Sequence, residues 1–509
     1  MDRNFNQLKA GVILNYVIIG LNAVVGLLYT PYMLRMMGQS EYGLYSLVAS
    51  VISYLTILDL GFGNAIIRYT AKFRAEGKER EQYEMFGMFL VLYLVIGIIA
   101  FAAGLVLYYN VDTLFGATMT VDELSKARIM MLLLTFNLAF TFPMSIFGAI
   151  INAYEEFVFV RVINIGRIIL NTLVMIVLLH MGYKSIAMVI VQTAFNILTL
   201  LLNYFYCKYK IKIKLIFSRF NWSFLKEMAI YSFWIFLAAI VDRIYLSTGQ
   251  IVLGAVAGTA VVAVFSVAMT LNGMYQQFST AMTSVFLPRV TAMVTQSKSD
   301  TEISNLFIRT GRLQYIVLSF ILSGYIIFGQ SFVNLWAGEG YEDAYIIGLL
   351  LLIPGTIPLC ENLGITIMQA RNQMKFRSLA YLVIAIVSVF FQILLGKLYG
   401  GIGCAIAIAL STVLGHILIM NIYYLKVQRI NIPLFFKEIL LMSILPVVLC
   451  GIGLLAVHYL QGFNTWVHLG FGIIIFTVVY IGLAYSFQIN SDEKKLILEV
   501  VARIRGKNI

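Results

Sequence analysis

Basic residues collect at every second junction between apolar stretches, and this alternation constrains the fold more than any other feature. The chain contains about fourteen apolar stretches of roughly 20–28 residues, each long enough for a membrane-spanning helix. Of its 36 lysines and arginines, 29 lie at one set of junctions. The exceptions are Arg35, Lys126, Arg128, Lys184 and Lys397 at the other junctions, and Arg167 and Arg243 within stretches. Because basic loops stay in the cytoplasm, the pattern predicts that both termini are cytoplasmic.

The composition excludes a soluble globular protein. The chain is 61% hydrophobic and 12% charged, whereas about a quarter of the residues of a soluble domain are charged. The net charge of +12 lies at predicted membrane junctions rather than in one patch, which favours lipid headgroups over nucleic acid as its partner. Four scattered cysteines show no paired spacing, so no disulfide or metal framework is predicted.

The apolar stretches predict an all-α integral membrane protein of about fourteen helices. The predicted spans are 8–34, 42–67, 84–109, 127–151, 157–180, 184–206, 224–250, 258–287, 310–336, 343–369, 376–396, 400–424, 434–459 and 465–488. We divide them into an N-terminal lobe (1–207, helices 1–6), a basic cytoplasmic linker (208–223), a C-terminal lobe (224–425, helices 7–12), two additional helices (426–489) and a cytoplasmic amphipathic tail (490–509).

Two segments suggest that the lobes are repeats of one another. Gly38 is followed by Arg68-Tyr-Thr-Ala after 30 residues, and Gly258 is followed by Arg289-Val-Thr-Ala after 31. Each lobe begins on the cytoplasmic side, so the repeat is parallel, related by a pseudo-two-fold axis along the membrane normal. Chance matching of small and apolar residues is the alternative. Two such lobes around a central cavity are the geometry of alternating access.

Ionisable residues within spans are costly in hydrocarbon and are therefore candidates for function. Arg167 can pair with Glu361 or Asp242, or it can meet a phosphate. Asp242 and Arg243 are adjacent on one helix and point about 100° apart, so one can pair while the other faces a cavity. Arg35 lies near the outer end of the first span.

Two carboxylates lie where their helices are weakened. Asp59 precedes Gly61 and Gly63, and it either bonds to freed backbone groups or takes part in ion coupling. Glu361 follows Pro354 and Pro358, which interrupt the tenth span and leave carbonyl groups for a cation site.

Aromatic and amide side chains at Tyr275 and Gln276 are candidates for contact with a sugar. Ordinary helix packing in the second lobe is the alternative interpretation. No nucleotide-binding motif, metal cluster or nucleophile motif is present in the sequence, and the outer loops are short. The sequence therefore favours a transporter over an enzyme.

The run Arg35-Met-Met-Gly-Gln-Ser-Glu-Tyr-Gly-Leu-Tyr-Ser, followed by Leu58-Asp-Leu-Gly-Phe-Gly and Arg68-Tyr-Thr-Ala, resembles the bacterial polysaccharide-export family. This family holds the Wzx flippases of O-antigen and capsule, within the superfamily of the multidrug and toxin extruders (MATE) and the lipid II flippase. The motif covers about residues 35–73, and the length and helix number match over the whole chain.

The resemblance implies transport of an undecaprenyl-diphosphate-linked oligosaccharide from the inner to the outer leaflet of a bacterial inner membrane. It implies Arg167, Arg243 and Arg35, with Tyr275 and Gln276, as substrate contacts. It also implies Asp242, Glu361 and Asp59 as coupling or counter-ion groups.

Under this resemblance the coupling ion is Na⁺ or H⁺, there is no organic cofactor, and the partners are membrane lipids, a polysaccharide polymerase and glycosyltransferases. A cation-coupled MATE-type drug or metabolite antiporter is the alternative function. A membrane scaffold or a glycan-assembly enzyme is a third.

Overall fold

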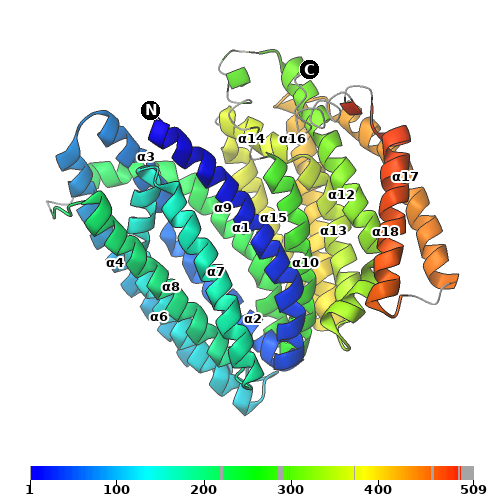
Figure 1. Ribbon diagram of the computed structural model, residues 1–509, viewed down its shortest axis with the longest axis horizontal. Coiled ribbons are helices and arrows are strands. Elements are labelled where there is room, and N and C mark those ends of the chain that lie inside the picture. The colour runs from blue at the N-terminus through cyan, green and yellow to red at the C-terminus, as the bar shows by residue number, and fades with distance from the viewer. Residues whose placement is uncertain are drawn as a thin grey trace. The chain divides into compact units, whose positions relative to one another are not determined.

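The protein is a bundle of long helices, seen in Figure 1. The computed structural model describes residues 2–217, 222–283, 298–371, 373–459 and 463–490, together with 286, 290, 292–294, 296, 493 and 494. Every regular element in these residues is a helix, so the predicted all-α membrane fold is confirmed. By contacts within the chain, the protein forms two compact units: unit 1 is Met1–Ser266 with Ile393–Gly401, and unit 2 is Val267–Gln392 with Ile402–Ile509.

Unit 1 is built from long helices, with α4, α6 and α8 side by side and α7 lying against α1. The helices are α1 (Asp2–Met37), α2 (Gln39–Leu55), α3 (Phe62–Ala75), α4 (Glu79–Tyr109), α5 (Val111–Phe115), α6 (Val121–Ala153), α7 (Phe157–His180), α8 (Ser185–Tyr206), α9 (Trp222–Val256) and the first part of α10 (Thr259–Thr283).

Unit 2 is centred on α12, which packs on α13, α17 and α18. Its helices are the rest of α10, α12 (Asp300–Ala337), α13 (Asp343–Cys360), α14 (Asn362–Ala370), α15 (Met374–Ser411) apart from Ile393–Gly401, the π-helix Thr412–Ile419, α16 (Met420–Lys426), α17 (Ile432–Tyr459) and α18 (Trp466–Leu483).

Within the described residues, each of the fourteen predicted spans falls on one helix or on two consecutive helices. Among the described residues, twelve helical segments are long and apolar enough to cross a membrane. One of them, Met374–Lys426, covers two predicted spans, and Gly400 (φ 58°, ψ −135°) interrupts the helix between them. The helix α9 covers the seventh predicted span.

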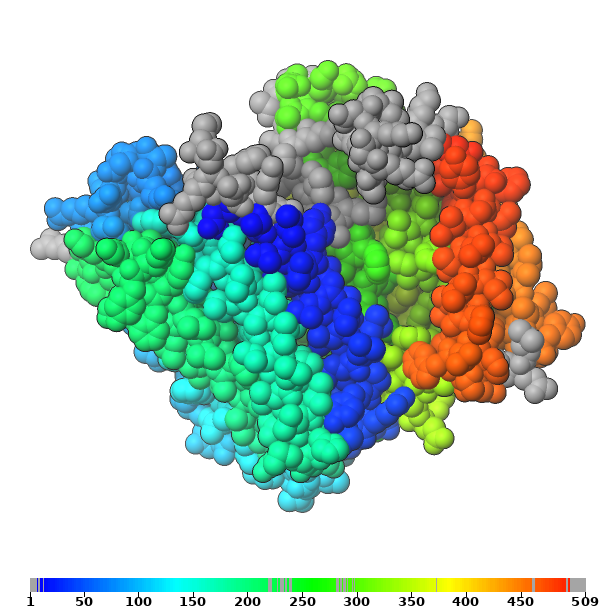
Figure 2. Space-filling view, in the orientation of Figure 1, coloured from blue at the N-terminus to red at the C-terminus, as the bar shows by residue number. Residues whose placement is uncertain are grey.

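The membrane-facing sides of the helices are apolar and exposed. Val467, Phe471 and Ile475 of α18, for example, are each at least 60% exposed. The outer face of α18 is part of the surface seen in Figure 2. Apolar surface of this extent is not maintained in water by a monomeric protein, and it is expected where helices face lipid. The chain is therefore a multi-pass membrane protein.

Two spans are interrupted. The span of α2 and α3 breaks at Leu60 (φ 53°) and Gly61 (φ 73°), two consecutive residues in the left-handed region. The span of α13 and α14 breaks at Glu361, one residue after α13 ends. The first interruption occurs at Gly61, which the sequence singled out, whereas Pro354 and Pro358 lie within α13 and the second interruption follows them at Glu361.

Three expectations are not tested by the described residues. The amphipathic tail predicted for 490–509 lies almost wholly outside them, as does Arg289 of the predicted repeat. The two compact units group α9 and the start of α10 with the N-terminal helices. The division into repeated lobes of 1–207 and 224–425 stays a prediction.

Candidate functional site

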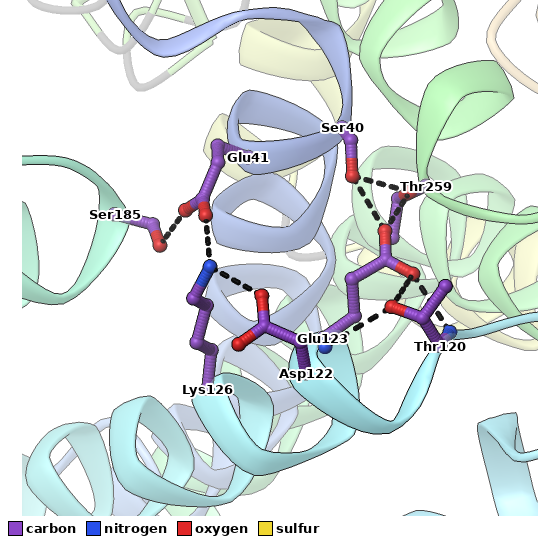
Figure 3. A network of polar contacts seen from close by, with 8 residues as sticks. All are labelled: Ser40, Glu41, Thr120, Asp122, Glu123, Lys126, Ser185 and Thr259. Carbon is purple, nitrogen blue, oxygen red and sulfur yellow. Dashed lines mark hydrogen bonds and ion pairs between the residues drawn. The ribbon is translucent and has the colours of Figure 1, made fainter.

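A network of carboxylates, hydroxyls and one lysine joins four helices at one end of unit 1 (Figure 3). This end is opposite to the basic end, which carries the lysine- and arginine-rich segments 68–80 and 208–214. We call it the carboxylate network; its members come from the N-terminal turns of α2, α6, α8 and α10 and the residues just before them, and they are Ser40, Glu41, Thr120, Asp122, Glu123, Lys126, Ser185 and Thr259.

Glu123 is the centre of one half of the network. Its carboxylate accepts hydrogen bonds from the hydroxyl of Ser40 (2.5 Å) and the hydroxyl of Thr259 (2.7 Å). It also accepts from the backbone N–H (2.8 Å) and the hydroxyl (2.9 Å) of Thr120, which forms a capping box at the start of α6. One side chain therefore ties α2 and α10 to α6.

Glu41 is the centre of the other half. It is buried in α2, accepts a hydrogen bond from the hydroxyl of Ser185, and forms an ion pair with Lys126 Nζ at 2.6 Å. Lys126 also pairs with Asp122 at 2.6 Å. The network thus contains three carboxylates and one lysine, and two of the carboxylates, those of Glu41 and Asp122, pair with that lysine.

A glycine permits the close approach of α2 and α10 beside the network. A Cβ atom at Gly43 would lie 1.8 Å from the carbonyl oxygen of Thr259, far inside van der Waals contact. The motif Gly38-Gln-Ser-Glu-Tyr-Gly, which carried the family resemblance, therefore supplies a hydroxyl, a carboxylate and a contact surface at this end.

A second polar group of side chains, which we call the amide seam, lies along α6 and α8. Asn196 donates from Nδ2 to Asn137 Oδ1 (2.8 Å) and to Thr141 Oγ1 (2.8 Å). One turn earlier on α8, Gln192 Oε1 accepts from the hydroxyl of Tyr45 at 3.0 Å. The seam comprises these five side chains.

Gln192 is exposed, although it does not lie on the membrane face of its helix. The exposed apolar residues Ile190, Leu198 and Phe205 mark that face, and at 100° per residue Gln192 projects from roughly the opposite side of α8. Its amide is therefore available to a polar molecule within the bundle rather than to lipid.

Arg167 lies in the middle of α7, half-buried, and forms no ion pair or hydrogen bond with the described part of the chain. Asn171 is one turn further along the same face, and its Oδ1 is buried with no hydrogen-bond partner among those residues. The hydroxyl of Tyr29, which lies close to Tyr45, is also buried without a partner there. Buried polar groups without partners are uncommon in native proteins and indicate a missing ligand or water.

Asp59 ends the short 3₁₀ turn at the break between α2 and α3, where the hydroxyl of Tyr93 donates to Oδ1 at 2.8 Å. The carboxylate also accepts a backbone hydrogen bond at Gly61. This arrangement matches the structural interpretation of Asp59, and its role in ion coupling stays a prediction.

Glu361 is only 2% exposed and lies in unit 2, at the break between α13 and α14. Its Oε1 has no hydrogen-bond partner among the described residues, and the amide of Asn421 on α16 is the polar group beside it. Asn421 Oδ1 is likewise buried without a partner there. A buried carboxyl group with spare hydrogen-bonding capacity is suited to accept a proton or a cation.

The remaining predicted residues are spread over both units. Arg35 is exposed in the last turn of α1, and on α9 Asp242 is exposed and Arg243 half-buried. Tyr275 is buried, and its hydroxyl hydrogen-bonds with Thr356 Oγ1 at 2.8 Å, as the packing interpretation expects.

Gln276, the neighbour of Tyr275 on α10, is half-buried. The substrate-binding and coupling roles of all these residues stay predictions.

An apolar groove of about 610 Å³ lies between α12, α17 and α18 in unit 2. Gly453 and Gly472 line it, and the walls include Phe328, Phe471 and Phe476. No group of three or more histidine, cysteine or carboxylate side chains suited to a metal ion occurs among the described residues.

These features define a many-helix membrane transporter fold with polar side chains inside a bundle. A model of the family described as "Polysaccharide biosynthesis protein" matches residues 8–294, which is more than half of the chain. The chain belongs to this family, and the resemblance found in the sequence is confirmed. It is similar to a "Putative O-antigen transporter" of Shigella flexneri, with 21% identity over 406 residues that cover 77% of this chain and 92% of that protein.

Two solved structures share the fold. The lipid II flippase MurJ in an inward closed conformation matches with a TM-score of 0.64 and 17% identity, covering 94% of this chain and 98% of that one. An inward-facing MATE multidrug transporter matches with a TM-score of 0.57 and 15% identity, covering 81% and 99%. At these identities the comparison establishes the fold.

Neither the carboxylate network nor the amide seam is predicted from the sequence. Thr120-x-x-Glu123 is a readable capping-box signature, and Gln192 and Asn196 are amides one turn apart in an apolar span. Neither signal reveals the distant partners, because Thr259 is 136 residues from Glu123.

Proposed function

We propose that this protein is a flippase that moves a glycan linked to undecaprenyl diphosphate from the inner to the outer leaflet by alternating access. The observation that carries the proposal is Arg167, a guanidinium group held within a membrane bundle without an ion-pair partner in the described part of the chain, next to the unsatisfied amide of Asn171. A diphosphate offers the charge-assisted, bidentate hydrogen bonds that such an arginine lacks.

Two further features suit a lipid-linked glycan. Amide and tyrosine side chains of the seam match the hydroxyl groups of a sugar, and Gln192 presents its amide away from the lipid face. The apolar groove between α12, α17 and α18 offers a place for an isoprenoid chain. A drug antiporter needs neither a diphosphate contact nor room for a long apolar chain.

We infer that the carboxylate network holds the outer end closed and that the basic end faces the cytoplasm, with both termini inside. A polysaccharide polymerase and glycosyltransferases are the expected partners, and the protein itself performs no covalent chemistry. Glu361 is the candidate for coupling to H⁺ or Na⁺, because it is a buried carboxyl group whose Oε1 accepts no hydrogen bond from the described residues.

The decisive test of function compares Arg167→Ala with Arg161→Ala, an arginine nearer the basic end of the same helix. Loss of charge-assisted bonds of about 1.5–3 kcal/mol predicts a fall in surface polysaccharide of tenfold or more for Arg167→Ala at equal protein level. Arg161→Ala is expected to change it less than twofold. Normal polysaccharide together with lost efflux of a cationic dye such as rhodamine 6G would favour the antiporter instead.

The coupling proposal is tested in proteoliposomes with an imposed pH or Na⁺ gradient. Glu361→Gln keeps the size of the side chain and removes its ability to ionise. The variant is expected to retain slow, gradient-independent transport and to lose the acceleration by the gradient. Unchanged acceleration would exclude Glu361 as the coupling group.

A further inference from the structure

A polar pocket of about 500 Å³ lies at the basic end of unit 1, apart from the network, the seam and Arg167. It forms where α6 turns into α7 and where the chain leaves α8. The lining residues are Tyr154, Glu156, Tyr209, Lys210, Ile211 and Lys212. Both sides of the pocket are the ends of membrane-spanning segments, so it lies at the depth of lipid headgroups.

The pocket carries positive charge. Lys210 and Lys212 are exposed, and neither forms an ion pair with a residue that the structure describes. The single acidic residue, Glu156, is already engaged, because its Oε2 accepts from Gln7 Nε2 (3.3 Å) and from the hydroxyl of Tyr206 (3.1 Å). The two lysines are therefore left to attract an anion.

One wall of the pocket is fixed in place. The guanidinium group of Arg74 lies 4.1 Å from the ring centre of Tyr154, and Gln82 donates to the hydroxyl of Tyr154 at 2.7 Å. Arg74 also donates to the carbonyl oxygen of Ala153 at 3.1 Å. The pocket is thus held by contacts from α3 and α4 and does not depend on its ligand for its shape.

The backbone at the other wall is strained. Lys212 has φ 59° and ψ 40°, the left-handed conformation that glycine or asparagine usually takes after a helix. A lysine in this conformation costs stability, and such outliers are concentrated at functional positions. Here the conformation ends the π-helical turn Cys207–Ile211 and leaves Lys212 beside Lys210 at the pocket.

The pocket is reached from the lipid side. Leu198, Leu202 and Phe205 form the exposed apolar stripe of α8, and Tyr209 continues it, with its ring stacked on Phe205 at 6.1 Å between centroids. A molecule whose chains lie along this stripe places its headgroup at the pocket. A soluble anion would gain nothing from the stripe.

We propose that this pocket binds the phosphate group of an anionic glycerophospholipid from the leaflet at the basic end, and that this lipid stabilises unit 1. The phosphate meets Lys210 and Lys212, the headgroup lies against Tyr154, and the acyl chains follow α8. The site binds a resident lipid and is independent of the transported substrate.

The test measures binding of palmitoyl-oleoyl phosphatidylglycerol to the purified full-length protein in detergent, by the rise in thermal unfolding midpoint during titration. The double variant Lys210→Gln/Lys212→Gln is compared with Lys208→Gln/Lys214→Gln, which makes the same change in net charge on the same segment with residues that do not line the pocket. All four lysines are exposed, so both variants are expected to unfold at the wild-type midpoint without lipid.

We expect the pocket variant to need at least a tenfold higher lipid concentration than the wild type for half of the rise in unfolding midpoint. The control variant is expected to change this concentration less than twofold. Equal losses in both variants would overturn the proposal, because they would indicate attraction to surface charge alone. Stabilisation by glycerol 1-phosphate at the same concentrations would overturn the assignment to a lipid.

Discussion

The carboxylate network gives the sharpest prediction, because one side chain accepts hydrogen bonds from two other helices. Glu123→Gln preserves the shape of the side chain but removes its charge and replaces one acceptor oxygen with a donor. The hydroxyls of Ser40 and Thr259, which both donate to Oε1 of Glu123, then share a neutral amide oxygen instead of a charged one, and the amide nitrogen faces the Thr120 N–H that Glu123 now satisfies. We expect the outer end of the protein to open more often.

The size of the effect follows from the bonds that change. A hydrogen bond to a charged group contributes about 1.5–3 kcal/mol and a neutral one about 0.5–1.5 kcal/mol. Weakening the bonds from Ser40 and Thr259, with Glu123 only half-buried, therefore costs the closed arrangement about 1–2 kcal/mol. This difference raises the ratio of open to closed protein about five- to thirtyfold.

The assay uses a cysteine placed beneath the network. Ser50 on α2 is 9% exposed and lies ten residues beyond Ser40, so Ser50→Cys is a small change at a site that the closed end shields. Its rate of reaction with a membrane-impermeant maleimide added to the outside of intact cells reports opening. Subtracting the rate of the parent protein removes the contribution of the native cysteines, three of which are buried.

The matched control is Asp122→Asn, the neighbouring carboxylate, whose side chain is 72% exposed and which pairs only with Lys126 among the described residues. Exposed pairs of this kind contribute about 0.3–0.5 kcal/mol, so labelling is expected to change less than about threefold. Equal labelling of the Glu123→Gln protein and the parent would refute the reasoning that this network closes the end. Equal acceleration by both variants would show that charge, rather than the hydrogen bonds to Ser40 and Thr259, is responsible.

Two further predictions concern packing and ion pairs. Gly43→Ala places a methyl group on the carbonyl oxygen of Thr259 and is expected to lower the thermal unfolding midpoint and surface polysaccharide together, whereas Gly63→Ala, with no atom within 4 Å of its added Cβ, is expected to change neither. Arg312→Ala leaves the carboxylate of Glu493, 1% exposed and 2.8 Å from the guanidinium, without its partner. It should lower the free energy of unfolding in detergent by about 3–5 kcal/mol. The double variant Arg312→Met/Glu493→Leu should recover most of that loss, and failure to recover would contradict the ion-pair explanation.

The fold was largely predictable, because span length and the placement of basic residues are local properties of the sequence. The fourteen predicted spans fall on helices, and the breaks near Gly61 and after Pro358 occur where backbone chemistry weakens a helix. The predicted spans 376–396 and 400–424 meet at the kink at Gly400.

The candidate site was less predictable, because its contacts join residues that are distant in sequence. Arg167 and Glu361 can be singled out from the sequence alone, because an ionisable side chain within a membrane span costs free energy. The same rule overlooks Glu123, because a charged group at the end of a helix has a low free-energy cost. It also overlooks Gln192, which is uncharged. Tyr275 was selected by its residue type, yet its hydroxyl forms a hydrogen bond with Thr356 inside unit 2.

The two ends of unit 1 differ in charge, and this difference has a consequence for a substrate that carries a diphosphate. Lysines 208, 210, 212 and 214 at the basic end attract phosphate, whereas the network at the opposite end has three carboxylates, those of Glu41, Asp122 and Glu123, and one lysine, Lys126. A diphosphate held by Arg167 halfway along α7 is therefore drawn in from the basic end and meets the carboxylates of the network when the network opens. Under the proposed function, the carboxylates that close the outer end also favour release once it opens, so Glu123→Gln should both open that end and slow the departure of the glycan.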